Sequence, residues 1–108
     1  MFRILDGKGF HITFDNDVTV SVQFGYGNYC GNYDNTREFV FGVTPKRAES
    51  LDAEIAIWQG TSGKNSSTWI TKEFMRDVMG EDPSDDVEGY CTPDVVLKAL
   101  NWAEQYSK

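Results

Sequence analysis

Two runs of alternating apolar and polar residues constrain the fold of this chain more than any other feature. In the first run Phe10, Ile12 and Phe14 alternate with polar residues, and residues 18–24 repeat the pattern after a turn at residues 15–17. Period-two patterning on both sides of an Asp/Asn turn predicts a β-hairpin. Its seven apolar side chains share one face, and burying them contributes roughly 1.5 to 3 kcal/mol each before conformational entropy is subtracted. The hairpin therefore needs a covering layer.

The end of the chain supplies a candidate cover. Thr92, Pro93 and Asp94 are typical of a helix start, with Thr as the N-cap, Pro at the first helical position and an acid in the first turn. Apolar residues then recur on successive turns: Val96, Leu97, Leu100 and Ala103. This spacing predicts a helix to about residue 106 whose apolar face packs on the hairpin.

The middle of the chain predicts further strands. Residues 38–43 and 53–58 alternate, with Ile55 and Ile57 directed inward in the second of these. Residues 68–74 either pair with 53–58 or begin a short helix, so strand and helix both stay open for 71–79. We therefore expect an α+β fold in which residues 1–108 form one domain. Its antiparallel sheet has about five strands, built from the N-terminal β-hairpin and a meander, and one C-terminal helix covers it.

The charge balance limits the partners that the chain can have. Seventeen acidic and ten basic residues give a formal net charge of −7, which disfavours binding to a phosphate backbone, so we expect no direct nucleic-acid partner. The acidity suits either solubility or a negative face toward a basic protein. Apolar runs are only a few residues long, and the N-terminus lacks the apolar run of a secretory signal. We therefore expect no membrane contact and a cytoplasmic location.

Residues 25–35 interrupt the regular patterning with three Gly, three Tyr and three Asn. Gly and Asn tolerate turns, Tyr offers a flat apolar face with a hydroxyl, and a loop on a rigid strand end often serves recognition. The tyrosines either present a binding surface or fold back onto the core. The candidate binding residues in and beside this loop are Tyr26, Asn28, Tyr29, Asn32, Tyr33, Asp34 and Arg37.

Residues 80–89 form a second candidate segment, rich in carboxylates. Their spacing does not match the calcium-binding loop, which needs acids at alternate positions and a central Gly. The segment is either a solvated acidic loop or a negative patch that faces a basic partner. Its candidate binding residues are Glu81, Asp82, Asp85, Asp86 and Glu88.

Residues suited to catalysis or metal binding are few. His11 is the only histidine and falls on the outward face of the first strand, and Cys30 and Cys91 are isolated. A Cys30–His11 pair would need a geometry that nothing in the sequence fixes, and structural zinc takes four ligands in close-spaced pairs. We therefore expect no enzyme, no cofactor and no metal. Both cysteines lie beside Tyr and Gly, in 28–31 and 89–92, so the two segments could meet at one end of the fold.

Four segments carry a resemblance to known proteins: GFHITF at 9–14, VQFGYGNYC at 22–30, AEIAIW at 53–58 and GYCTPDVVL at 89–97. They are similar to small uncharacterised proteins carried by bacteriophages and mobile elements. The resemblance implies a short, acidic, non-enzymatic protein in the host cytoplasm. It also implies a function in binding and blocking a host machine, including defence machines such as CRISPR complexes.

Three hypotheses follow for function. In the first, the carboxylates meet a host protein with a basic surface while Tyr26, Tyr29 and Tyr33 act as aromatic anchors of an inhibitor. In the second, the same loop binds a nucleotide signal by stacking and through backbone amides, with Arg37 and residues 46–47 supplying positive charge.

The third hypothesis is a homodimer. The second face of the sheet would carry Val40, Ala56, Trp58 and Trp69, which is more aromatic surface than a monomer needs. A homodimer through that face is compatible with either binding function.

Overall fold

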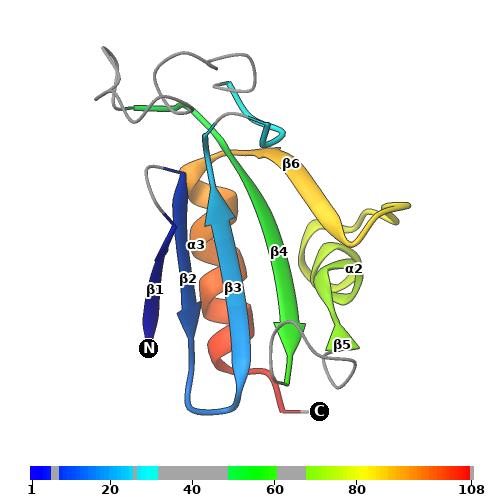
Figure 1. Cartoon of the computed structure of the whole chain (residues 1–108). Helices are drawn as coiled ribbons and strands as arrows, with labels where there is room; N and C mark the ends of the chain where they lie inside the picture. The colour runs from blue at the N-terminus through cyan, green and yellow to red at the C-terminus, as the bar shows by residue number, and fades with distance from the viewer. Residues whose placement is uncertain (6–7, 26, 32–48, 61–67, 108) are drawn as a thin grey trace.

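The computed structural model describes residues 1–5, 8–25, 27–31, 49–60 and 68–107. These residues form an α+β fold, as the sequence predicts, and their antiparallel sheet has six strands where about five were expected (Figure 1). The strand order is β1-β2-β3-β4-β5, and β6 also pairs with β4. The strands are β1 (Phe2–Leu5), β2 (Gly9–Thr13), β3 (Val18–Gln23), β4 (Ala53–Gln59), β5 (Thr68–Trp69) and β6 (Val87–Cys91). The helices are α2 (Thr71–Phe74), the π-helical turn η1 (Met75–Met79) and α3 (Pro93–Glu104).

The predicted hairpin is confirmed as β2 and β3. Phe10 pairs with Val22 and Thr13 with Thr19, and the Phe14 amide closes the turn by donating to Val18 O at 2.9 Å. Asp17 has φ 65°, the left-handed conformation that ends a three-residue hairpin loop. The period-two pattern therefore places its apolar residues on one face, as expected.

Asn16 in this turn ties the hairpin to the C-terminal helix. Its Nδ2 donates to Ala103 O and Tyr106 O, each at 2.9 Å, and its Oδ1 accepts from Val18 N at 3.2 Å. Ala103 O also accepts from the Tyr106 amide at 3.2 Å, so the Asn16 side chain adds a second donor at the end of α3 and links that end to the turn. The helix itself ends at Glu104, slightly before the predicted end at residue 106.

The outer edge of β4 is divided between two strands. β5 pairs with Trp58 and Gln59, whereas β6 pairs with residues 53–56. Between them the buried Thr71 hydroxyl accepts from Ile57 N at 2.8 Å and lies 3.3 Å from Ile57 O. The chain leaves the sheet here, so the two interpretations of residues 68–79 hold in succession: a strand over 68–69, then a helix.

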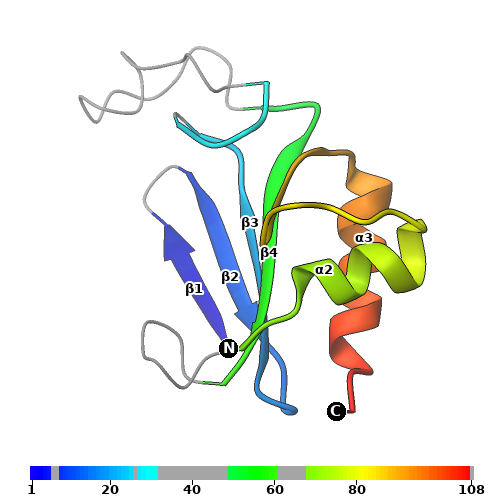
Figure 2. The same cartoon turned by 90° about the vertical axis from the view of Figure 1, so that its right-hand side faces the viewer.

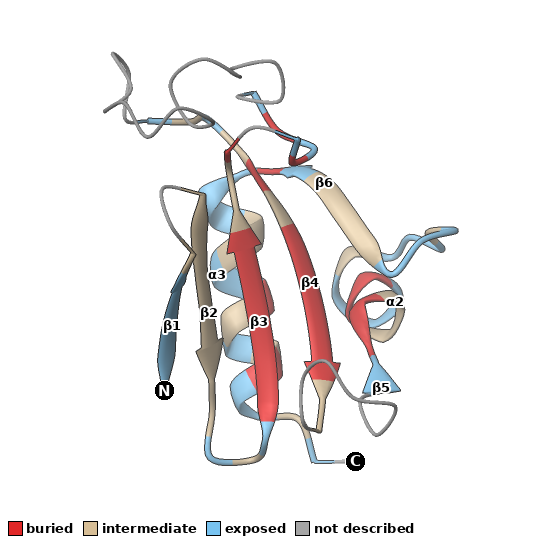
Figure 3. Ribbon diagram, viewed as in Figure 1, coloured by how far each residue is buried: buried red, intermediate tan, exposed pale blue. Residues whose placement is uncertain are grey.

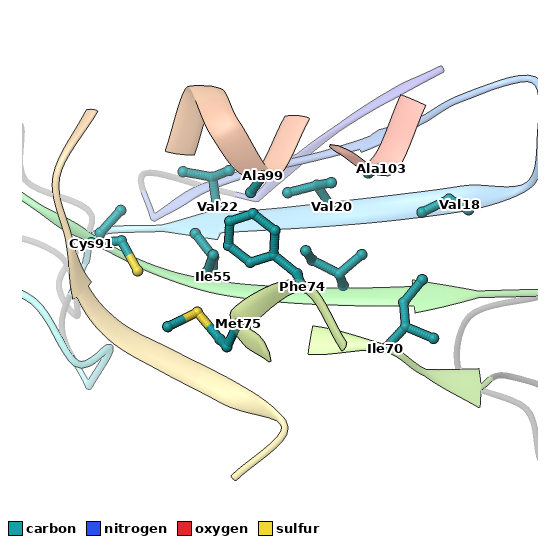
Figure 4. Packing of buried hydrophobic residues seen from close by; sticks show 12 residues of the cluster. Val18, Val20, Val22, Ile55, Ile70, Phe74, Met75, Cys91, Ala99 and Ala103 are labelled. Atoms are coloured by element: carbon teal, nitrogen blue, oxygen red, sulfur yellow. The ribbon is translucent and has the colours of Figure 1, made fainter. Parts of the chain in front are cut away.

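The core lies between the sheet and a helical layer on one of its faces. α2 and α3 lie on the same side of the sheet (Figure 2), and the predicted single covering helix is therefore joined by α2 and η1. Phe74 is fully buried, and its ring centroid is 5.7 Å from that of Trp102. Figure 4 shows the packing of the core cluster, which includes Val18, Val20, Val22, Ile55, Ile57, Ile70, Phe74, Met75, Ala99 and Ala103.

Two strands were not predicted from the sequence. β1 pairs with β2 at the sheet edge, where Phe2 and Ile4 stay exposed, and β6 occupies part of the predicted acidic loop at 80–89. Burial is concentrated in the central strands β3 and β4, whereas β1 is largely exposed (Figure 3). The predicted strand at 38–43 lies outside the described residues.

Candidate functional site

Two exposed tyrosines meet at one end of the fold. Tyr90 N donates a hydrogen bond to Tyr29 O at 2.8 Å, and the two residues are 60% and 51% exposed. Tyr90 has φ 55°, the left-handed conformation, which marks a local departure from regular strand geometry. The two Tyr-Cys segments, 28–31 and 89–92, therefore meet as their similar flanks suggested.

Close packing holds Tyr29 against β6. A Cβ placed on Gly89 would lie 2.6 Å from Tyr29 Cβ, so only glycine allows this approach. The Tyr29 amide donates to Glu54 Oε2 at 3.1 Å, and the Gly31 amide donates to Asp52 Oδ1 at 2.7 Å. Backbone hydrogen bonds therefore hold the segment around Tyr29 against Glu54 in β4 and against Asp52, which directly precedes β4.

Asn28 is buried, and its side chain adds to the hydrogen bonds that hold this segment in place. Its side chain is buried, with Oδ1 accepting from Gly25 N at 3.1 Å and Nδ2 donating to Gln23 Oε1 and Glu54 Oε1 at 3.1 and 3.2 Å. Its side-chain amide is therefore used within the fold, and its role in binding stays a prediction. Asn amides satisfy buried loop ends in this way because they both donate and accept.

Carboxylates concentrate around the paired tyrosines. Burial raises the pKa of Glu88, and the charge of Glu81 raises it further. Burial also raises the pKa of the Cys91 thiol to about 12, with further contributions from Glu88, Asp52, Glu81 and Glu54. The thiol is therefore protonated at neutral pH, and the potential around it is negative. We call this region the tyrosine–carboxylate surface; it comprises Tyr29, Tyr90, Asp52, Glu54, Glu81 and Glu88.

The other predicted loop acids are exposed and lie outside this surface. Asp82 pairs with Arg76 at 3.0 Å, and both side chains are exposed. Asp85 and Asp86 are also exposed. Five further predicted binding residues lie outside the described part of the chain: Tyr26, Asn32, Tyr33, Asp34 and Arg37.

Three residues of the surface were missed at the sequence level: Tyr90, Asp52 and Glu54. The repeated Tyr-Cys pair beside Gly was the available signal for Tyr90, because it marked two segments that could meet. Asp52 and Glu54 gave no such signal. Their role depends on the position of the loop at 28–31, which is set by tertiary contacts.

The opposite face of the sheet holds an aromatic cluster. Trp58 is only 5% exposed, and its ring lies 5.1 Å from those of both His11 and Trp69. Burial and the nearby charge of Arg3 lower the pKa of His11. Trp58 and Ala56 are buried and offer little surface to a second copy, whereas Trp69 is exposed. Val40 lies outside the described residues, so the homodimer through this face stays a prediction, which light scattering tests.

The described residues contain no group of three or more His, Cys, Asp or Glu side chains placed to hold a metal ion. Among the helices described, none is both long and apolar enough to cross a membrane.

Comparison with protein-family models, curated proteins and solved structures finds no significant match.

Proposed function

We propose that this protein is a non-enzymatic binding protein that docks on a basic surface of another protein through the tyrosine–carboxylate surface. The observation that carries the proposal is the pairing of two exposed tyrosines, joined by the 2.8 Å hydrogen bond from Tyr90 N to Tyr29 O, among converging carboxylates. Tyrosines are enriched among the residues that dominate binding energy in interfaces, and complementary charge guides association.

The local electrostatics favour a cationic partner. Glu88 carries its charge at a cost, because burial and Glu81 both raise its pKa. A Lys or Arg from another protein would relieve that cost, since an opposite charge stabilises a carboxylate. Fixed backbone contacts at Tyr29 and Gly31 also hold the surface in one arrangement, which lowers the entropy lost on binding.

The resemblance to phage proteins suggests that the partner is a host protein. A host protein whose basic groove binds nucleic acid would accept an acidic surface in place of the phosphate backbone. The protein would then act as an inhibitor of a host machine, with defence complexes among the targets. Net charge −7 supports this direction, because it favours long-range attraction to a basic groove.

The nucleotide hypothesis has less support. It needs free backbone amides in the Gly/Tyr/Asn loop to hold a phosphate, but the amides of Tyr29 and Gly31 already donate to the carboxylates of Glu54 and Asp52. Those carboxylates would also repel a phosphate. Thermal-shift measurements with nucleotides test the hypothesis, because a ligand at a hundred times its dissociation constant stabilises a protein by about 2.7 kcal/mol.

The proposal is tested by identifying a partner from host extract and then measuring its affinity for purified variants. Tyr29→Ala and Tyr90→Asn remove the rings, and Asn tolerates the positive φ at position 90. We expect each to weaken binding about tenfold, or about 1.4 kcal/mol. Asp15→Asn, in the hairpin turn, is the control and should bind as the wild type does. Equal affinity of all four proteins would refute the proposal.

A further inference from the structure

An apolar pocket lies next to the tyrosine–carboxylate surface. It has a volume of about 290 Å³ and lies between the first half of α3, the end of β3 and the residues leading into β4. Val22 in β3 and Phe24 just after it line the pocket from the sheet, and Val96, Leu97 and Leu100 line it from α3. Val22 and Cys91, which also lines the pocket, lie toward the same end of the core in Figure 4.

The pocket is open to solvent beside two apolar side chains. Leu51 and Leu97 both line it, and they are 89% and 57% exposed. Exposed leucines around an apolar hollow are costly in an isolated protein, and such surfaces mark interaction sites. The volume is just below the range of roughly 300 to 1,000 Å³ for small-molecule pockets. It suits one large side chain better than a drug-sized ligand.

The pocket and the tyrosine–carboxylate surface share residues and charge. Asp52 lines the pocket and also accepts from Gly31 N at 2.7 Å in the surface. Cys91 follows Tyr90 directly and pairs with Ala53, another residue of the pocket wall. The charges of Glu54, Glu81 and Glu88 act on Cys91 as well. Any segment that fills the pocket therefore places its neighbouring residues in a negative potential.

We propose that this pocket binds one large apolar side chain of the partner protein, flanked in the partner's sequence by Lys or Arg residues that contact the tyrosine–carboxylate surface. The inference rests on the proposed function and specifies the chemistry of the partner segment. The apolar walls select the anchor, and the surrounding carboxylates select its cationic neighbours. An anionic amphiphile such as a fatty acid would meet the same carboxylates with the wrong charge.

Two synthetic peptides test the inference: amidated Gly-Lys-Arg-Leu-Arg-Lys-Gly and the same sequence with Gly in place of Leu. Each is titrated into isotope-labelled protein while the amide resonances are followed. We expect both peptides to shift the amides of Tyr29, Glu88 and Tyr90. Only the Leu peptide should shift Ala53 and Leu97, and it should bind about tenfold more tightly.

Leu97→Ser provides the matched variant, because the Leu97 side chain is more than half exposed and lies outside the core cluster. The substitution should abolish the affinity difference between the two peptides. Val78→Ser is the control, since Val78 is also exposed but does not line the pocket. Val78→Ser should preserve the difference.

The outcomes separate the two proposals. If both peptides shift the tyrosine–carboxylate surface with equal affinity and the pocket amides do not move, the pocket inference is overturned and the proposed function stands. If the Leu peptide shifts the pocket alone, the flanking-charge part of the inference and the proposed surface are both overturned. If neither peptide shifts either set of amides, both proposals fail.

Discussion

At the scale of single residues, Gly89 decides whether Tyr29 can lie against β6. An added Cβ would lie 2.6 Å from Tyr29 Cβ and 3.1 Å from Tyr29 O, so Gly89→Ala must displace the segment at 28–31. We expect a loss of about 1–3 kcal/mol in the free energy of unfolding, as for other overpacked sites, together with weaker partner binding. Chemical denaturation measures the first effect.

Gly31→Ala is the control for this prediction. Its added Cβ would meet Asp52 Oδ1 at 3.6 Å, an ordinary van der Waals distance. The two variants add the same methyl group on the two sides of one contact region. If both were equally stable, close packing at Gly89 would not be what positions Tyr29.

Glu88 gives a prediction about pH. Its pKa in the folded protein is raised above 4.5, so the unfolded chain releases the proton more readily and the ionised carboxylate lowers stability at neutral pH. Glu88→Gln should therefore raise the melting temperature near neutral pH. The gain should shrink as the pH falls through the raised folded-state pKa and vanish below about pH 3.5, where both side chains are uncharged.

Thermal unfolding of both proteins across this pH range is the measurement. Asp85→Asn, an exposed acid of the preceding segment, controls for the change in net charge. A gain that persists unchanged at low pH would exclude the carboxylate charge as its cause. A stabilising substitution at Glu88 that weakens partner binding would show that the carboxylate is retained for recognition.

At the scale of secondary-structure elements, Thr71 takes the place of a strand where β5 and β6 separate. Thr71→Val keeps the shape but leaves the buried Ile57 amide without its 2.8 Å acceptor. An unsatisfied buried donor costs about 1–3 kcal/mol, and we expect that loss in chemical denaturation. Thr71→Ser retains the hydroxyl and should lose less. Equal losses in both variants would show that the hydroxyl contributes no more to stability than the γ-methyl group does.

The elements that sequence patterns predicted are those whose signals are local. The alternation in β2 and β3 and the Thr92-Pro93 start of α3 need only neighbouring residues, so both were predicted. β6 contains Glu88 and Gly89 and becomes a strand through its pairing with β4, which no local pattern reveals. β1 is a short edge strand with exposed Phe2 and Ile4 and gives an equally weak signal.

The contrast between local signals and tertiary contacts also explains which residues of the candidate site could be predicted. Tyr29 and the loop carboxylates were proposed as binding residues because their residue types suit recognition. Asn28 was proposed on the same grounds, although its amide is used within the fold. Composition shows which side chains could bind, but it does not show which are already satisfied by the fold. Tyr90 belongs to the site because its amide donates a hydrogen bond to Tyr29 O, and this contact depends on the tertiary structure.

At the scale of the whole molecule, the carboxylates of the tyrosine–carboxylate surface act together at one place. Glu88 lies on β6, at the far side of β4, and the charges of Glu88, Asp52, Glu81 and Glu54 all act on Cys91 at the end of the same strand. A negative field concentrated at one side steers a basic partner toward that side before contact. The paired tyrosines contribute only once the partner has arrived. The two kinds of residue should therefore affect different rate constants.

This division predicts the kinetics of partner binding, measured by biosensor at low and high salt. Glu81→Gln combined with Glu88→Gln should lower the association rate constant several-fold and weaken its dependence on salt, because long-range attraction is screened within about 10 Å at 0.1 M ionic strength. Tyr29→Ala should leave association nearly unchanged and raise the dissociation rate constant about tenfold. If the charge substitutions changed only the dissociation rate constant, the carboxylates would act as buried contacts in the complex and not through long-range attraction of the partner.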